Sequence, residues 1–428
     1  MPNYLKILQE ELILALGCTE PIAIALAAAH AGALTGEKPE TIDVYASGSI
    51  IKNANSVYVP HSGGRQGVLI SAALGAVAAA PELKLRVLQK VDDAILKQAL
   101  ALTAGGHVRL HLEKNVDNIY IRVKVKTASH TAQAVISQVH HHLSYQELDG
   151  KVLLDVEKQS SGGLTDRSGM SLQGIYDYAT SVSLEDSPEL TALLDQQIHS
   201  NMDIAREGLA KPWGQEVGRT LHDMADGDPF REAIALAAAA SDARMAGCDS
   251  PVTINAGSGN QGITCSVAVV HMAHSMKAPP EKLYRALILS NLIAIYAKQF
   301  IGKLSAFCGV VTAAAGAGCG IAFLQDMPLD EIQMTLTNTL ATSGGIICDG
   351  AKGSCASKIA VSLHNAALAI DMSRRGKVFQ PRDGIVGQTV EDTIRNIGTI
   401  AAEGMVPTDQ VILKIMTDQS NHPDHKEA

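Results

Sequence analysis

The sequence is poor in aromatic residues: they make up 4% of its 428 residues and include a single tryptophan. A core built mainly on large aromatic side chains is therefore excluded. Hydrophobic residues nevertheless reach 46%, and the chain has 37 glycines. Because small side chains let helices approach closely, this composition favours tightly packed helices. The length is sufficient for two or three domains.

An excess of positive charge is also absent, because the formal net charge is −9. This argues against nucleic acid as a partner. The N-terminus has no basic start followed by an apolar run, so we expect a cytoplasmic protein without a secretory signal. The longest uncharged run, Leu304–Gln325, is rich in Gly and Ala. It is only weakly apolar, and we expect a buried helix there rather than a membrane span. We expect a homo-oligomer, namely a dimer, with no membrane partner.

Paired cysteine motifs are missing as well. The seven cysteines are odd in number and follow neither a disulfide framework nor the CxxC spacing of zinc sites. Cys308, Cys348 and Cys355 stand 40 and then 7 positions apart, each near small residues. Three thiolates without a fourth are compatible with an iron–sulfur cluster that has one open iron. The alternative is three ordinary buried hydrophobes, which the spacing alone favours.

A further cysteine, Cys18, lies between two expected helices. Leucines repeat at helical spacing over residues 3–16, Gly17 ends that helix, and Thr19 can cap the next one. A helix N-terminus lowers the pKa of a thiol and so favours the thiolate, whereas Glu20 opposes that effect. The alternative is a buried linker cysteine.

Residues 41–150 read as an α+β region with a mainly antiparallel sheet. A strand pair is expected to turn at Asp149-Gly150. The run His140-His141-His142 does not predict a metal site, because consecutive residues of a strand point to opposite faces. We expect an exposed polar run there. The other expected strands lie at about 42–46, 56–59, 108–112 and 119–125, with helices at about 66–80 and 91–103.

The segment Pro60–Gly67 is glycine-rich and opens one of these helices. Its backbone N–H groups would suit a carboxylate or phosphate, and a plain tight turn is the alternative. His61 could serve as a base or as a substrate contact.

The second half of the chain is almost entirely helical in pattern. Ser160–Gly169 has the composition of a linker. The helices expected after it lie at about 171–179, 187–210, 229–246, 262–276, 279–300, 309–325, 329–342, 355–374 and 390–403.

The stretch Gly257–Gly262 is a literal GxGxxG. A dinucleotide site would require a βαβ unit, but helices follow this stretch without a second strand. An anion-binding loop at the start of a helix is the better interpretation. The side chains of Ser258, Asn260 and Gln261 can add hydrogen bonds there.

Four segments together resemble one known family. They are Gly-Cys18-Thr-Glu-Pro, Asn255-Ala-Gly-Ser-Gly-Asn-Gln-Gly, Leu-Ser-Ala-Phe-Cys308-Gly and Cys348-Asp-Gly-Ala-Lys. The chain resembles the L-cysteine desulfidase family, which is related to the iron–sulfur L-serine dehydratase α chain. The resemblance extends from near the N-terminus to about Ser373.

This resemblance implies that Cys308, Cys348 and Cys355 hold a 4Fe–4S cluster and that Cys18 is an additional thiol near the active site. The implied reaction is β-elimination of L-cysteine to pyruvate, ammonia and sulfide, with an open iron as Lewis acid and a base for the Cα proton. Cys18 could cap that iron or act as the base, and His61 is the other candidate base. The expected substrate-binding residues are Asn255, Ser258, Asn260, Gln261 and Lys352.

The expected fold class is α+β, with a mostly helical catalytic domain and an inserted α+β domain built on an antiparallel sheet. The rival functions are L-serine dehydratase, a nucleotide-binding oxidoreductase that uses Gly257–Gly262, and a binding protein for small anions that has lost its cluster. The expected domains are N-terminal helices of the catalytic domain (1–38), the inserted domain (39–165), a helical connection (166–215) and the helical iron–sulfur domain (216–420).

Overall fold

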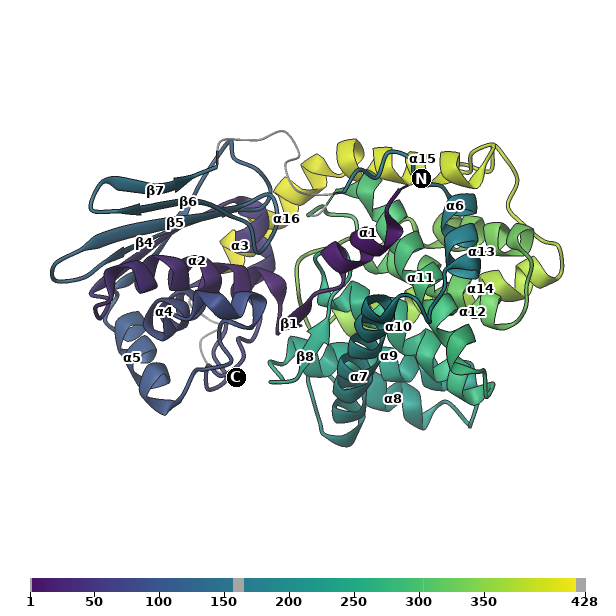
Figure 1. Cartoon of the computed structure of the whole chain (residues 1–428), viewed down its shortest axis with the longest axis horizontal. Coiled ribbons are helices and arrows are strands. Elements are labelled where there is room, and N and C mark those ends of the chain that lie inside the picture. The colour runs from purple at the N-terminus through teal and green to yellow at the C-terminus, as the bar shows by residue number, and fades with distance from the viewer. Residues whose placement is uncertain (1, 157–164, 303, 421–428) are drawn as a thin grey trace.

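The computed structural model describes residues 2–156, 165–302 and 304–420. It has a mixed α+β fold, with a six-stranded sheet in one part and a large group of helices in the other (Figure 1). The α+β class is therefore confirmed. Of the expected linker, residues 160–164 lie outside the described residues.

The six-stranded sheet has the order β3-β2-β4-β5-β6-β7 and is mixed rather than purely antiparallel. The β2–β3 pair is parallel, with Ile42 opposite Val108, and the other pairs are antiparallel. The chain between β2 and β3 is long and helical, which is the crossover that a parallel pair requires. The expected strand at 56–59 forms only a bridge between Tyr58 and Gln66. The strands are β2 (Thr41–Ala46), β3 (Val108–Leu112), β4 (Tyr120–Lys126), β5 (Thr131–Ser137), β6 (Leu143–Leu148) and β7 (Lys151–Asp155).

Helices α2 (Thr19–Thr35) and α4 (Val68–Ala78) accompany the sheet (Figure 1). Helix α2 packs on β4, β5 and α4 and is almost wholly buried. A Cβ added at Gly75 would lie 2.0 Å from the carbonyl oxygen of Ala25, so the two helices approach backbone to backbone. Small residues thus provide the packing that the scarcity of aromatics predicts. The remaining segments of this part are α3 (Gly48–Ala54), the 3₁₀ segment η1 (Pro81–Arg86) and α5 (Asp93–Ala104).

The helical part surrounds α12 (Val310–Leu324), which packs on α10, α11, α13 and α14. Nearly every side chain of α12 is buried, as expected for the uncharged run. Within the described residues, no helix combines the length and the apolar character that crossing a bilayer demands. The neighbouring helices are α6 (Leu172–Ser181), α7 (Pro188–Ala210), α8 (Val217–Asp223), α9 (Pro229–Met245), α10 (Gly259–Ser275), α11 (Pro280–Ile301), α13 (Leu329–Ser343), α14 (Cys355–Arg374) and α15 (Val390–Thr399).

Both ends of the chain connect the two parts. The expected helix at 3–16 is shorter, because α1 (Tyr4–Glu11) gives way to β1 (Leu14–Leu16). Strand β1 pairs antiparallel with β8 (Pro251–Thr253), and this pairing carries Cys18, two residues after β1, to the start of α10. At the other end, the π-helical turn η2 (Ile400–Gly404) leads into α16 (Val406–Ser420), which contacts α3.

Candidate active site

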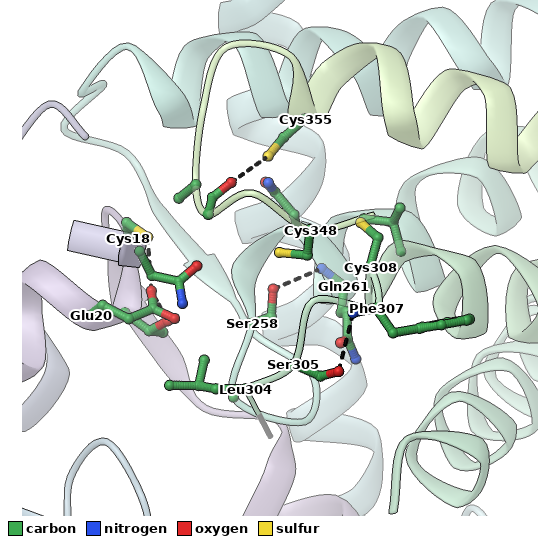
Figure 2. Close-up of a pocket in the computed structure, with 18 of the residues that line it drawn as sticks. Cys18, Glu20, Ser258, Gln261, Leu304, Ser305, Phe307, Cys308, Cys348 and Cys355 are labelled. Atoms are coloured by element: carbon green, nitrogen blue, oxygen red, sulfur yellow. Dashed lines mark hydrogen bonds between the residues drawn. The ribbon is translucent and has the colours of Figure 1, made fainter. Parts of the chain in front are cut away.

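One pocket brings together four cysteines from distant parts of the sequence. Cys18, Cys308, Cys348 and Cys355 all line it. In Figure 2, Cys18 faces the pocket from the start of α2, and the other three cysteines come from the opposite, helical part. The other three cysteines, Cys248, Cys265 and Cys319, are buried and do not line this pocket.

Local backbone pairing positions Cys308, Cys348 and Cys355. The N–H of Cys308 donates to the carbonyl of Ile346 at 3.0 Å, and Phe307 forms a bridge with Ile347. These contacts hold the segments around Cys308 and Cys348 side by side. Cys355 is the first residue of α14, and the backbone N–H of Lys352 lies 3.5 Å from its sulfur.

Positive charge surrounds these three thiols. Lys52 is 1% exposed, and its ammonium donates to the carbonyl of Cys348 at 3.3 Å and pairs with Asp409. Lys298 lines the pocket and is 6% exposed. The Cys308 thiol, Lys52 and Lys298 together lower the pKa of Cys348, although burial opposes them. The same contact between the two cysteines, together with burial, raises the pKa of Cys308. The pair therefore favours a thiolate on Cys348.

Cys18 lies in the opposite electrostatic environment. Its sulfur donates a hydrogen bond to Oε2 of Glu20 at 3.0 Å. Burial raises the pKa of the Cys18 thiol far above its ordinary value, and the charge of Glu20 raises it further. The expectation of a lowered thiol pKa at this helix start is therefore wrong. Desolvation and the adjacent carboxylate outweigh the helix dipole.

Glu20 lies near a histidine of the connection between β5 and β6. Nε2 of His140 lies 3.7 Å from Oε1 of Glu20. Although burial alone would raise it, His140 and the Cys18 thiol lower the pKa of Glu20 to about 2. His140 is 2% exposed, and neither ring nitrogen has a hydrogen-bond partner among the described residues. The expectation of an exposed histidine run thus fails at His140, because the β5–β6 connection folds under the loop at Gly257, where an added Cβ would lie 3.3 Å from Nδ1.

The start of α10 forms another wall of the pocket. Ser258 caps the helix by accepting the N–H of Gln261 at 3.4 Å, and Asn260 and Gln261 line the pocket. Arg244 of α9 also lines it and donates to Oδ1 of Asn260 at 3.2 Å. Strand β8 before this loop pairs only with β1, so within the described part of the chain the βαβ context of a dinucleotide site is absent.

Three other predicted site residues do not line the pocket. His61 follows Pro60, which packs on Gly17, but its backbone N–H and its ring lie near Asp249. Asn255 is fully buried and donates to Oδ1 of Asn291 at 2.9 Å, so it supports the loop from behind.

The third residue, Lys352, lies beside Cys355, with its backbone N–H 3.5 Å from the sulfur of that cysteine. Its ammonium is buried without a hydrogen-bond partner among the described residues. Burial lowers the pKa of Lys352, and the nearby charges of Asp349, Cys355 and Cys18 oppose this effect.

Several residues of the site carried no clear signal in the sequence. Glu20 stood out only as an acidic residue in a first turn. Arg244 is a charged residue inside the alanine-rich run 235–246, and such an interruption of an apolar helix is the signal that could have drawn attention to it. The other site residues without a clear signal in the sequence are His140, Lys52 and Lys298.

The donor set is suited to an anionic group held by thiolates. Lys352 Nζ is buried without a hydrogen-bond partner among the described residues and lies near the charges of Cys355, Cys18 and Cys348. In the described ranges, no three His, Cys, Asp or Glu side chains are grouped as ligands of a single metal ion. An iron–sulfur cluster needs no such group, because each cysteine binds a different iron and the sulfurs stand farther apart. The site therefore fits a three-cysteine cluster better than a mononuclear metal.

Comparison with known proteins identifies the family. The model of the serine dehydratase alpha chain matches residues 82–414, a range that contains Cys308, Cys348 and Cys355. The chain belongs to the serine dehydratase alpha chain family. This membership confirms the expected family relationship and indicates a serine dehydratase-like lyase.

Relatives that match almost the whole chain carry only a general name. The "UPF0597 protein" of Lachnoclostridium phytofermentans is 43% identical over 413 residues, which are 96% of this chain and 98% of the relative. The protein of the same name in Finegoldia magna is 41% identical over 422 residues, covering 98% of this chain and 100% of the relative. A third, in Aliivibrio fischeri, is 37% identical over 423 residues, covering 97% and 98%. These names specify no substrate.

Proposed function

We propose that this family member is an iron–sulfur-dependent L-cysteine desulfidase that converts L-cysteine to pyruvate, ammonia and sulfide by β-elimination. One observation carries the proposal: Cys308, Cys348 and Cys355 line a pocket rich in positive charge, and Cys18 faces them. L-serine dehydration is the second candidate, favoured by the name of the matching family.

Cys308, Cys348 and Cys355 would hold a 4Fe–4S cluster in this proposal. When bound, the cluster would supply a Lewis-acidic iron for the leaving thiol or hydroxyl group. Lys52 and Lys298 offset the negative charge of the thiolates. Leu304, Phe307 and Val310 form an apolar wall that limits the access of water.

Cys18 is the base of the proposal, and Glu20 positions its side chain. In this structure the thiol donates to the Glu20 carboxylate at 3.0 Å and keeps its proton, because its pKa lies far above that of Glu20. Once it is a thiolate, Cys18 takes the Cα proton, the β-carbon–sulfur bond breaks, and the resulting enamine hydrolyses to pyruvate and ammonia. His140 holds Glu20 in its ionised form.

The domain organisation is part of the same proposal. The proposed inserted α+β domain, residues 39–165, packs on α2 of the N-terminal segment, and this packing places Cys18, Glu20 and Asn53 opposite the helical thiols. The predicted substrate contacts Ser258, Asn260 and Gln261 lie at the start of α10, on the wall beside Cys308.

An anaerobic reconstitution tests this proposal. We expect about four irons and four sulfides per chain. The reconstituted protein is then given L-cysteine and L-serine side by side, and pyruvate and sulfide are measured. A desulfidase turns over L-cysteine with the higher kcat/KM, whereas a preference for L-serine establishes the second candidate. A protein without iron and without pyruvate formation removes both.

A further inference from the structure

Arg244 is a buried cation without a counter-ion in the described part of the chain. Its side chain lies on α9, is 2% exposed and lines the cysteine pocket. It donates to the neutral amide oxygen of Asn260 at 3.2 Å, and its Nε has no hydrogen-bond partner among the residues that the structure describes. By contrast, Arg285 pairs with Glu281, and Arg167 pairs with Glu11. An unpaired buried charge is costly, so a missing anion is expected beside Arg244.

The start of α10 faces the same guanidinium. A Cβ added at Gly259 would lie 2.3 Å from Nε and 2.7 Å from Nη2 of Arg244, so the guanidinium lies directly against the first residue of this 17-residue helix. The first-turn N–H groups and the helix dipole favour an anion there. The side-chain nitrogen Nε2 of Gln261, a residue that is 1% exposed, also lacks a hydrogen-bond partner within the described ranges. The guanidinium of Arg244, the start of α10 and the side-chain amide of Gln261 thus all favour an anion at the same place.

The protein's own anions near this point are already engaged. Glu20, the carboxylate that lines the pocket, is occupied by Cys18, Thr19 and His140. Cys348 has Lys52 and Lys298 as neighbouring cations. Arg244 contributes to the electrostatics of the thiols, yet its planar fork of donors is suited to a carboxylate, which it can bind through two parallel hydrogen bonds.

We propose that Arg244 and the start of α10 form the subsite for the α-carboxylate of the substrate, an inference that rests on the proposed function. The subsite restricts the enzyme to α-amino acids, because an amine or amide of the same shape leaves the guanidinium unpaired. Asn260 orients Arg244 through its amide oxygen. Arg244 is therefore the residue that distinguishes an amino acid from its amide analogue, which lacks the carboxylate.

Two unreactive ligands test this assignment by calorimetry on the reconstituted protein. L-alanine and L-alaninamide share the ammonium and the methyl group, and only L-alanine has the carboxylate. Wild-type protein should bind L-alanine more tightly by at least about 10-fold. In Arg244→Met, the Kd of L-alanine should rise on the order of 10- to 100-fold, and that of L-alaninamide by less than about 3-fold. Wild-type protein that fails to bind L-alanine, or shows no preference, overturns the proposal, as does equal weakening of both ligands by the variant.

Matched variants separate the carboxylate role from other roles. Arg285→Met removes a cation of α11 outside the pocket and should leave the ligand preference intact. Gly259→Ala retains Arg244 but displaces its guanidinium, so it should also abolish the preference, which keeps the test decisive if Arg244→Met fails to fold. Loss of iron from Arg244→Met with an unchanged preference would make Arg244 a counter-ion of the cluster and overturn the proposal.

The binding test can be carried out whether or not the protein catalyses the proposed reaction. If reconstitution yields no iron, the proposed function fails, and the same titrations are carried out on the iron-free protein. A preference for L-alanine that depends on Arg244 then establishes the carboxylate subsite without the lyase. Normal turnover of L-cysteine with no role for Arg244 in ligand preference leaves the lyase intact and removes the subsite.

Discussion

On one side of the pocket, the Cys308 thiol and two buried lysines lower the pKa of the Cys348 thiol. On the other side, Cys18 lies against Glu20, and burial together with that carboxylate raises the pKa of its thiol. The residue type is the same, and the neighbouring charges differ. The first environment is suited to a thiolate that binds iron, and the second to a thiol that holds and transfers a proton.

The largest effect is expected when the thiol of Cys348, which lies near the two lysines, is removed. Cys348→Ala should lose the cluster, and with it all measurable turnover, because no other thiolate occupies its place. Iron and sulfide analysis after anaerobic reconstitution measures this. Cys265→Ala and Cys319→Ala are the matched controls, since both thiols are buried outside the pocket, and their iron content should equal that of wild type. Equal loss of iron in all three variants would contradict the ligand assignment.

Removal of the Cys18 thiol, which lies beside Glu20, should leave the iron content of the protein nearly unchanged. Cys18→Ser retains the three proposed ligands, so we expect most of the iron to remain. Turnover of L-cysteine should fall by about 10² to 10⁴-fold, the range for loss of a general acid–base group. Comparison of kcat with iron content measures this. Near-normal turnover would reduce Cys18 to a packing residue and remove it as the base.

A smaller effect is expected when only the charge near Cys348 is changed. Lys298→Met retains the apolar stem and removes an ammonium that lowers the pKa of Cys348. The pKa of that thiol should rise, and the rate of iron loss to a chelator should increase by about 10-fold. Lys282→Met, at an exposed ion pair with Asp326, serves as the control. Unchanged iron loss in Lys298→Met would show that the lysine does not stabilise the thiolate.

The smallest effect concerns the stability that Glu20 contributes. Its folded pKa of about 2 lies below the ordinary value of 4.5. A lowered carboxyl pKa stabilises the folded state above the unfolded pKa, and this contribution disappears as the pH falls from about 4.5 toward 2. The difference in unfolding free energy between wild type and Glu20→Gln should therefore shrink by about 2 kcal/mol over that range. Urea unfolding at several pH values measures it, and a difference independent of pH would mean that Glu20 is not held ionised.

Local patterns were sufficient to predict much of the fold. The helix 355–374 matches α14 in both bounds, and the uncharged run forms the buried helix α12. The turn at Asp149-Gly150 joins β6 to β7 as expected. These features depend on side-chain periodicity and turn residues over a few neighbouring positions, which the sequence displays directly. The parallel β2–β3 pair was missed because strand direction depends on the path of a long connection.

The sequence by itself determined the helices, most of the strands and the chemical identity of the candidate thiols. Only the tertiary structure decided that Cys18 meets the other three cysteines, because the pairing of β1 with β8 carries it there. It also decided the direction of the Cys18 pKa shift, the burial of His140 and the isolation of Arg244. Each of these depends on desolvation and on charges from segments far away in the chain, and no local pattern records them.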